Sequence, residues 1–264
     1  MLSGSPASRL LRGSLHVVNP IRLAINGANG RMGSALQELL RDDARFVVAT
    51  RIGSADDWRH APVLDVVVDF SSPRGFDAAL AHCEEHGVAL ASGTTGLDAA
   101  QRARIGAAAA KIPVLHAANF SLGIAVLAHL LRDAAAALPE WDLEIIEAHH
   151  ARKVDAPSGT ALALGRAAAE ARSQDFEAMA VLARSGQAGE RKTGAIGFAS
   201  IRAGDIVGEH TAILATAGER LELSHRATDR AIFARGALTA AAWLAGKPPG
   251  RYSLDDAVRT PAVS

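Results

Sequence analysis

From Ile21 to about Phe120 the chain alternates short apolar runs with segments of helical period. The first run, residues 21–26, leads into a glycine-rich turn, and apolar residues then recur at helical spacing up to Leu40. Four later runs share this character, each followed by a turn that bears glycine or serine: 46–50, 65–70, 88–92 and 113–117. Strands that alternate with helices predict a parallel sheet covered on both faces, a doubly wound α/β domain.

A different pattern begins after Asn119. We expect a helix to about residue 138, a strand over 143–147, a polar loop and a second helix from Ser158. Three runs with strand-like content follow, at 194–203, 205–214 and 220–225. Because only short turns separate them, they are predicted to pair antiparallel. A final helix over about 229–244 is too long for a linker and is expected to return to the first domain.

Composition limits the partners and the compartment. The 264 residues suffice for one large domain or two modest ones. Lys plus Arg and Asp plus Glu both number 28, so no global field favours nucleic acid or an anionic membrane surface. The only cysteine, Cys83, excludes an internal disulfide and fits a reducing cytoplasm. No apolar run approaches the roughly 20 residues of a membrane span.

Residues 1–19 contain Arg9, Arg12, several serines and no acids. This composition is typical of an organellar transit peptide. It is equally typical of a flexible tail or of translation from an upstream start codon, and we favour a flexible tail over residues 1–20.

The first glycine-rich turn has the features of a dinucleotide-binding loop. Gly27, Gly30 and Gly33 lie between a predicted strand and a predicted helix, where backbone N–H groups and a helix N-terminus can hold a pyrophosphate. The spacing differs from the common G-x-G-x-x-G, and the alternative is a purely structural turn. The predicted cofactor contacts here are Gly27, Ala28, Asn29, Gly30, Arg31 and Met32.

The end of the second predicted strand bears on the choice of cofactor. In NAD-binding folds a carboxylate there usually binds the ribose 2′-hydroxyl, whereas an arginine suits a 2′-phosphate. Here Thr50 supplies no carboxylate and Arg51 offers a planar cationic group. We therefore predict that NADPH is preferred and that NADH is also accepted, the alternative being that Arg51 is a solvated surface residue.

Two later turns follow predicted parallel strands and so lie at the carboxyl edge of the sheet, where ligands bind in open α/β sheets. Their small residues leave room for the nicotinamide and its ribose, although both could be ordinary turns. The candidate cofactor contacts are Gly93, Thr94, Thr95, Ala117, Ala118, Asn119 and Phe120.

The loop after the strand 143–147 gathers cationic donors ahead of a helix N-terminus: His149, His150, Arg152 and Lys153. With the first-turn N–H groups near Ser158, this loop suits a substrate with more than one carboxylate. Ser158 is also a good helix cap, which is a structural explanation of its own. No cysteine or suitably spaced acid accompanies the histidines, so no metal site is predicted.

These residues match a known family. The run Glu144-Ile-Ile-Glu-Ala-His-His-Ala-Arg-Lys-Val-Asp-Ala-Pro-Ser-Gly-Thr-Ala161 closely resembles the signature of the 4-hydroxy-tetrahydrodipicolinate (dihydrodipicolinate) reductases of lysine biosynthesis. Other matching runs begin at residues 27, 93, 117, 191 and 204, and the resemblance covers about residues 21–244.

The resemblance implies an α/β fold: a Rossmann-like doubly wound domain over 21–120 and 229–264, and a smaller α+β substrate domain with a mixed or antiparallel sheet over 121–228. It also implies a homotetramer and a small cyclic dicarboxylate substrate that receives hydride from NAD(P)H. By position, His149 and Lys153 resemble the proton donors of the family. The implied substrate contacts are His150, Ser158, Gly159 and Thr160.

Two other functions fit parts of the sequence. The first is a Rossmann oxidoreductase that acts on another small acid, although an acylating aldehyde dehydrogenase would need an active-site cysteine in a setting that Cys83 lacks. The second is a nucleotide-binding sensor without activity, which is disfavoured because every matched catalytic position is filled.

Overall fold

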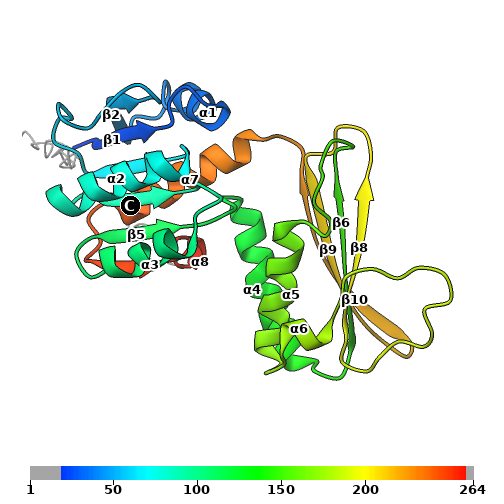
Figure 1. Cartoon of the computed structure of the whole chain (residues 1–264). Coiled ribbons are helices and arrows are strands. Elements are labelled where there is room, and N and C mark those ends of the chain that lie inside the picture. The colour runs from blue at the N-terminus through cyan, green and yellow to red at the C-terminus, as the bar shows by residue number, and fades with distance from the viewer. Residues whose placement is uncertain (1–18, 260–264) are drawn as a thin grey trace, which may run out of the picture.

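The computed structural model describes residues 19–259, and the N-terminal segment discussed above lies outside them, apart from its last residues. Figure 1 shows two sheets, joined by helices, with a long helix near the C-terminus leading back to the first sheet. The elements of the first part are β1 Ile21–Asn26, α1 Arg31–Leu39, β2 Phe46–Ile52, β3 Val66–Asp69, α2 Pro73–His86, β4 Ala89–Ser92, α3 Ala99–Ala108 and β5 Pro113–His116.

Six strands form a parallel sheet in the order β11-β5-β4-β3-β1-β2, which confirms the predicted doubly wound arrangement. Consecutive residues of each strand alternate between two cores. In β1, Leu23 and Ile25 face the core built with α1, α7 and α8, whereas Ala24 faces the core built with α2 and α3. A sheet buried on both faces explains why its strands are almost continuously apolar.

The remaining elements build the second sheet and return to the first (Figure 1). They are α4 Leu122–Ala137, β6 Asp142–His149, α5 Gly159–Ala171, α6 Phe176–Met179, β7 Ala180–Val181, β8 Ile196–Arg202, β9 Gly208–Thr216, β10 Glu219–Ala227, α7 Ala231–Leu244, β11 Gly250–Tyr252 and α8 Leu254–Arg259. The second sheet is mixed, with the order β10-β9-β6-β8-β7, and α4 and α5 pack on one face of it. Helix α7 packs against the six-stranded sheet through its small apolar side chains.

The antiparallel pairing expected for the last three strands is only partly right. Strands β9 and β10 pair antiparallel, but β8 pairs parallel with β6 and does not pair with β9. Strand β6 lies between β8 and β9, so the short connection between those two strands passes over the end of β6. Backbone hydrogen bonds hold it there, from Ala203 to His149 (3.0 Å) and from Ala151 to Gly204 (3.1 Å).

Candidate active site

The loop between β1 and α1 has the geometry of a pyrophosphate-binding turn. Gly27 adopts a φ of +81°, which side chains disfavour, and an added Cβ at Gly33 would lie 2.4 Å from the carbonyl oxygen of Gly27. Helix α1 begins after Gly30, and no side chain caps its first N–H groups. These N–H groups therefore remain available to an anion at the helix N-terminus.

A cavity of about 710 Å³ opens beside this loop. Gly27, Asn29 and Gly30 line it, as predicted, together with residues that follow β2 and β3, including Trp58 and Arg74. Of the other predicted contacts in this loop, Ala28 is buried, Arg31 is exposed and Met32 packs against the core. A cavity of this size at a glycine-rich turn and a helix N-terminus fits one end of a dinucleotide.

The end of β2 differs from the sequence expectation. The strand continues past Thr50 and Arg51 to Ile52, and neither Thr50 nor Arg51 lines the cavity. Arg51 is exposed, and its Nε donates to Oε1 of Gln37 at 2.9 Å. The acidic residues that line the cavity are Asp56 and Asp57, and Asp56 accepts a hydrogen bond from the amide of Gly53 at 2.7 Å. The loop after β2 folds back toward the cavity, so that Asp56, four positions beyond the end of the strand, lines it.

A buried carboxylate organises the carboxyl edge of the first sheet. Asp69, at the end of β3, accepts hydrogen bonds from Asn26, Ser71, Ser92 and Thr94 at 2.5–2.8 Å. These donors come from the ends of β1 and β4 and from the turns that follow β3 and β4. Asp69 therefore fixes the glycine-threonine turn predicted to contact the cofactor, with Thr94 buried and Thr95 exposed.

The other predicted cofactor turn, Ala117–Phe120, lies against the substrate-side helix. Asn119 donates from Nδ2 to Oγ1 of Thr160 at 3.0 Å, which joins the carboxyl edge of β5 to the first turn of α5. Phe120 is buried in the core, whereas Ala118 is exposed. The structure thus brings a predicted cofactor residue and a predicted substrate residue together.

Strand register brings four polar side chains together at one end of the second sheet. The inward-facing positions of β6 are apolar at first and then become Glu147 and His149. Glu147 lies opposite His210 of β9, and His149 lies opposite Arg202 of β8. Because alternate residues share a face, these four side chains point to the same side as the N-terminus of α5.

The charges of this group are set by burial and hydrogen bonding. Burial alone would raise the pKa of Glu147, but hydrogen bonds from Arg202, Ser200 and His149 outweigh it and lower that pKa to about 2. His210 is buried, and burial together with the neighbouring His149 lowers its pKa to about 4. At neutral pH Glu147 is therefore ionised and His210 is neutral.

The loop after β6 carries the other predicted donor. Lys153 Nζ lies 2.8 Å from Asp155 Oδ1, and the backbone N–H of Lys153 donates to the carbonyl of His150. His150 Nδ1 is buried and has no hydrogen-bond partner among residues 19–259. The loop therefore presents one ammonium with a replaceable partner and one imidazole nitrogen that a ligand could satisfy.

Ser158 differs from the expectation in its bonding. Its amide donates to Oε1 of Glu147 (3.1 Å), and its hydroxyl caps α5 at the amide of Ala161 (3.1 Å) and contacts Nε2 of His210 (3.1 Å). The Ser158 amide is therefore engaged inside the protein and is not free for a substrate carboxylate. The first-turn amides of Gly159 and Thr160 have no acceptor within the helix and face the end where an anion would bind.

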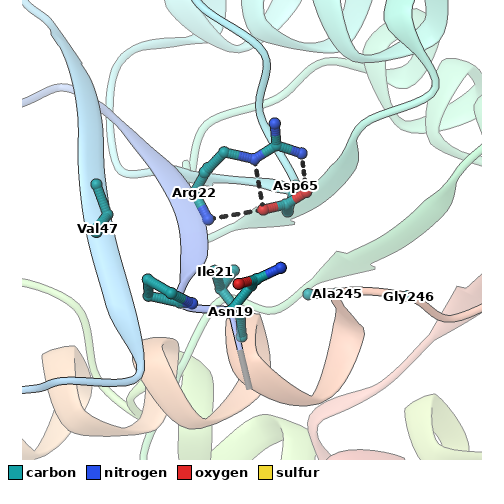
Figure 2. A pocket seen from close by; sticks show the side chains of 8 residues that line it. Asn19, Ile21, Arg22, Val47, Asp65, Ala245 and Gly246 are labelled. Atoms are coloured by element: carbon teal, nitrogen blue, oxygen red, sulfur yellow. Dashed lines mark hydrogen bonds and ion pairs between the residues drawn. The ribbon is translucent and has the colours of Figure 1, made fainter. Parts of the chain in front are cut away.

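A second hollow, of about 660 Å³, lies at the opposite edge of the first sheet (Figure 2). It is bordered by the first residues of β1 and β2 and by Ala245 after α7. Arg22 and Asp65 form a two-pronged ion pair there, with N–O distances of 3.0 and 2.6 Å (Figure 2). Opposite charges that satisfy each other leave little to attract an ionic ligand, so this hollow contributes nothing to the site.

The described part of the chain contains neither a metal-binding cluster nor a membrane-spanning helix. Residues 19–259 contain no cluster of three or more His, Cys, Asp or Glu side chains that could hold a metal ion. Within the same residues, no helix is both long and apolar enough to cross a membrane.

Three residues of the candidate site were not singled out from the sequence: Glu147, Arg202 and His210. Glu147 and His210 lie within runs that carry the family resemblance, and Arg202 lies between two of those runs. Only pairing between β6, β8 and β9 brings the three together. The alternation in β6 could have indicated the site: positions 143 and 145 are apolar, and the next two positions on the same face are Glu147 and His149. A charged residue at an inward-facing position is costly unless it is paired, so Glu147 could have been singled out.

Comparison with known proteins gives a consistent result for both parts of the chain. The family model described as "Dihydrodipicolinate reductase, N-terminus" matches residues 21–120, and "Dihydrodipicolinate reductase, C-terminus" matches residues 123–258. The chain is 49% identical to the 4-hydroxy-tetrahydrodipicolinate reductase of Xanthomonas campestris pv. campestris (strain B100) over 255 residues, covering 91% of this chain and 98% of that protein. It is 47% identical to the enzyme of the same name from Caulobacter vibrioides over 251 residues, covering 90% and 96%.

A solved structure has the same fold. Dihydrodipicolinate reductase from Paenisporosarcina sp. TG-14, described as dipicolinate-bound, superposes with a TM-score of 0.73 at 23% identity. The match covers 90% of this chain and 99% of that one. The arrangement of a parallel sheet and a mixed sheet is therefore shared.

Proposed function

The chain belongs to the dihydrodipicolinate reductase family, and on this premise we propose that His149 and Lys153 are its proton donors and that the N-terminus of α5 binds a substrate carboxylate. The activity itself is that of a 4-hydroxy-tetrahydrodipicolinate reductase, an NAD(P)H-dependent step of lysine and diaminopimelate biosynthesis. The substrate is a small cyclic dicarboxylate. The reaction consumes one hydride and one proton and releases one water.

The observation that carries the proposal is the contact between the two halves of the site. Asn119 comes from the carboxyl edge of the parallel sheet and bonds Thr160 in the first turn of α5 at 3.0 Å. Ligands in open α/β sheets bind at that carboxyl edge. A substrate carboxylate at the Gly159 and Thr160 amides would thus lie next to the place where the nicotinamide is expected.

When bound, NAD(P)H supplies the hydride, which we place at C4 of the ring after water has left that carbon. The protein contributes binding and protons. His150 offers its unpartnered Nδ1 to a substrate oxygen, and Lys153 can exchange Asp155 for a substrate carboxylate. His149 and Lys153 then supply the proton that the electron-rich product-forming intermediate requires.

The activity is measured directly with the product of dihydrodipicolinate synthase as substrate, by following the absorbance of the reduced cofactor. We expect turnover with both NADPH and NADH. An absence of turnover with this substrate would favour a Rossmann oxidoreductase for another acid or a nucleotide-binding sensor. Those two are separated by whether any reduced cofactor is consumed with other small keto or imino acids.

For the cofactor we propose a preference for NADPH, mediated by Arg51. Its guanidinium is exposed near the end of β2, and Gln37 holds it through Nε, so its terminal nitrogens can contact a 2′-phosphate. Replacing Arg51 with alanine should lower kcat/KM for NADPH by roughly ten- to hundredfold and leave the value for NADH nearly unchanged, because charge-assisted hydrogen bonds contribute roughly 1.5–3 kcal/mol.

The matched control is Arg45→Ala, which removes another exposed arginine, just before β2 and bonded to Asp43. This control should not change the ratio of kcat/KM for NADPH to kcat/KM for NADH. If Arg51→Ala also leaves that ratio unchanged, the preference is not mediated by Arg51. The carboxylate of Asp56 in the cavity would then be the residue to test next.

We also propose that the protein assembles as a homotetramer through the second sheet. The face of this sheet turned away from α4 and α5 carries Ile146, Ile201 and Ile213, and Ile201 is 49% exposed. Apolar side chains on an open sheet face are typical of an interface. Sedimentation equilibrium should give a mass of four chains, and the mass of one chain would refute the assembly.

A further inference from the structure

A buried carboxylate lies directly behind the proposed proton donor. We propose that Glu147 is a positioning residue that keeps the proton of neutral His149 on Nδ1 and so presents Nε2 to the substrate. The inference deepens the proposed function, since it rests on His149 being the group that exchanges a proton with the substrate. It assigns a role to a residue that does not itself touch the reacting atoms.

The surroundings of Glu147 contain only hydrogen-bond donors. Its side chain is 0% exposed and receives two hydrogen bonds from Arg202, at 2.8 and 2.7 Å. The amide of Ser158 donates to Oε1 at 3.1 Å. The Ser200 side chain also donates to this carboxylate, and the last contact is with Nδ1 of His149, at 2.5 Å from Oε2.

The tautomer of His149 follows from this arrangement. The pKa of Glu147, lowered to about 2, keeps its carboxylate ionised, and an ionised carboxylate can only accept hydrogen bonds. The Nδ1 atom of His149 must therefore carry a proton in both charge states of the ring. Nε2 is then the nitrogen that gains and loses the exchanged proton. On the Nε2 side lies Gly208, where an added Cβ would come within 3.1 Å of that nitrogen. The glycine keeps this nitrogen uncovered.

The other charged groups around His149 do not compete for Nδ1. On β8, Arg202 neutralises Glu147, and on β9, His210 is uncharged at neutral pH and packs edge-on to the His149 ring at 5.2 Å. In the loop after β6, Lys153 is paired with Asp155. The adjacent His150 has a pKa lowered by burial and by surrounding cations, Arg230 and Arg152 first among them.

Glu147→Gln in a Ser200→Ala background provides a sharp test, with Ser200→Ala alone as the reference. Ser200 is the one hydroxyl among the donors to Glu147, and without it the amide must place its NH2 group toward one of the three remaining donors. The Arg202 guanidinium and the Ser158 amide cannot become acceptors, whereas a neutral imidazole can move its proton. The variant should therefore turn its NH2 toward His149 and shift the proton of that ring from Nδ1 to Nε2. A buried residue with a purely structural role would not move this proton.

The measurement is ¹⁵N NMR of the full chain with ¹⁵N-labelled histidine, with the His149 signals identified by their loss in His149→Gln. In spectra of the neutral ring, the signals of the protonated and the bare nitrogen should exchange places in Glu147→Gln. Glu144→Gln is the control, since Glu144 is also a β6 carboxylate held by arginines, Arg184 and Arg191, but does not contact a histidine. It should leave the His149 signals in place.

Kinetics provide the second readout. Glu147→Gln should lower kcat by at least about tenfold with little change in KM, since a wrongly protonated imidazole still fits but cannot exchange its proton at the right atom. If this variant does not fold because Arg202 is left unpaired, the further substitution Arg202→Leu removes the second charge without adding an acceptor and permits the same two measurements.

An unchanged His149 tautomer in a folded Glu147 variant overturns the inference, whatever the activity. Normal kcat in His149→Gln overturns the proposed role of His149 instead and leaves the tautomer result standing as a structural fact. The two failures are thus separable.

Discussion

Replacing His149 with glutamine is expected to lower kcat by roughly 10²-fold or more, the usual effect of losing a positioned proton donor. Glutamine has nearly the length of histidine and can still hydrogen-bond Glu147, but it holds no proton that it can give up at neutral pH. His149 is 12% exposed and anchored by a 2.5 Å contact, so the loss should reflect chemistry more than a collapse of the site. Steady-state kinetics at saturating substrate measure the effect.

A comparison with the next residue separates proton transfer from binding. His150→Gln should mainly raise KM, because its Nδ1 is proposed to contact a substrate oxygen and not the reacting carbon. A near-normal kcat in His149→Gln would remove that residue from the mechanism. An equal loss of kcat in both variants would mean that the two histidines act as one unit.

Lys153→Ala should also lower kcat by roughly 10²-fold or more. The ammonium is 21% exposed and held at 2.8 Å by Asp155, which is itself 54% exposed and can be displaced by a substrate carboxylate. Alanine removes both the second proton donor and a positive charge from a dicarboxylate site. A rise in KM should accompany the loss of kcat and is measured in the same experiment.

The matched control for this variant is Asp155→Asn. It removes the ion pair but leaves the ammonium, so it should keep kcat and lower KM, because the substrate no longer competes with an internal carboxylate. If Lys153→Ala kept a normal kcat, Lys153 would be a binding residue only. If Asp155→Asn lost activity to the same extent, the ion pair itself would be needed to hold the loop.

Five of the six strands of the first sheet could be predicted because each is part of a local pattern, whereas the short edge strand β11 was not predicted. Short apolar runs followed by turns and helices indicate parallel strands, and Gly27 and Gly33 have the conformation and the close contact expected of them. The strand boundaries shifted by only one or two residues. One such shift mattered: β2 extends to Ile52, and the cavity beside the glycine-rich turn is lined by the loop that bears Asp56 and not by Thr50.

The second sheet was less predictable because the order of strands in a mixed sheet does not follow their order in the sequence. Nothing local indicates that β6 inserts between β8 and β9. The insertion makes Glu147 the neighbour of His210 and places Arg202 beside His149. A prediction based on short turns alone therefore paired β8 with the wrong strand.

The sequence alone determined the doubly wound domain, the glycine-rich turn after β1, the family and the segment from His149 to Thr160 that carries the proposed chemistry. All of these depend on residues close together in the chain, where period, spacing and motif are directly visible. Only the tertiary structure decided that Ser158 binds Glu147, that Asp56 enters the cavity and that Glu147 lies between His149 and Arg202. These contacts depend on strand order and loop path, and a buried charge finds its partners only when the chain has folded.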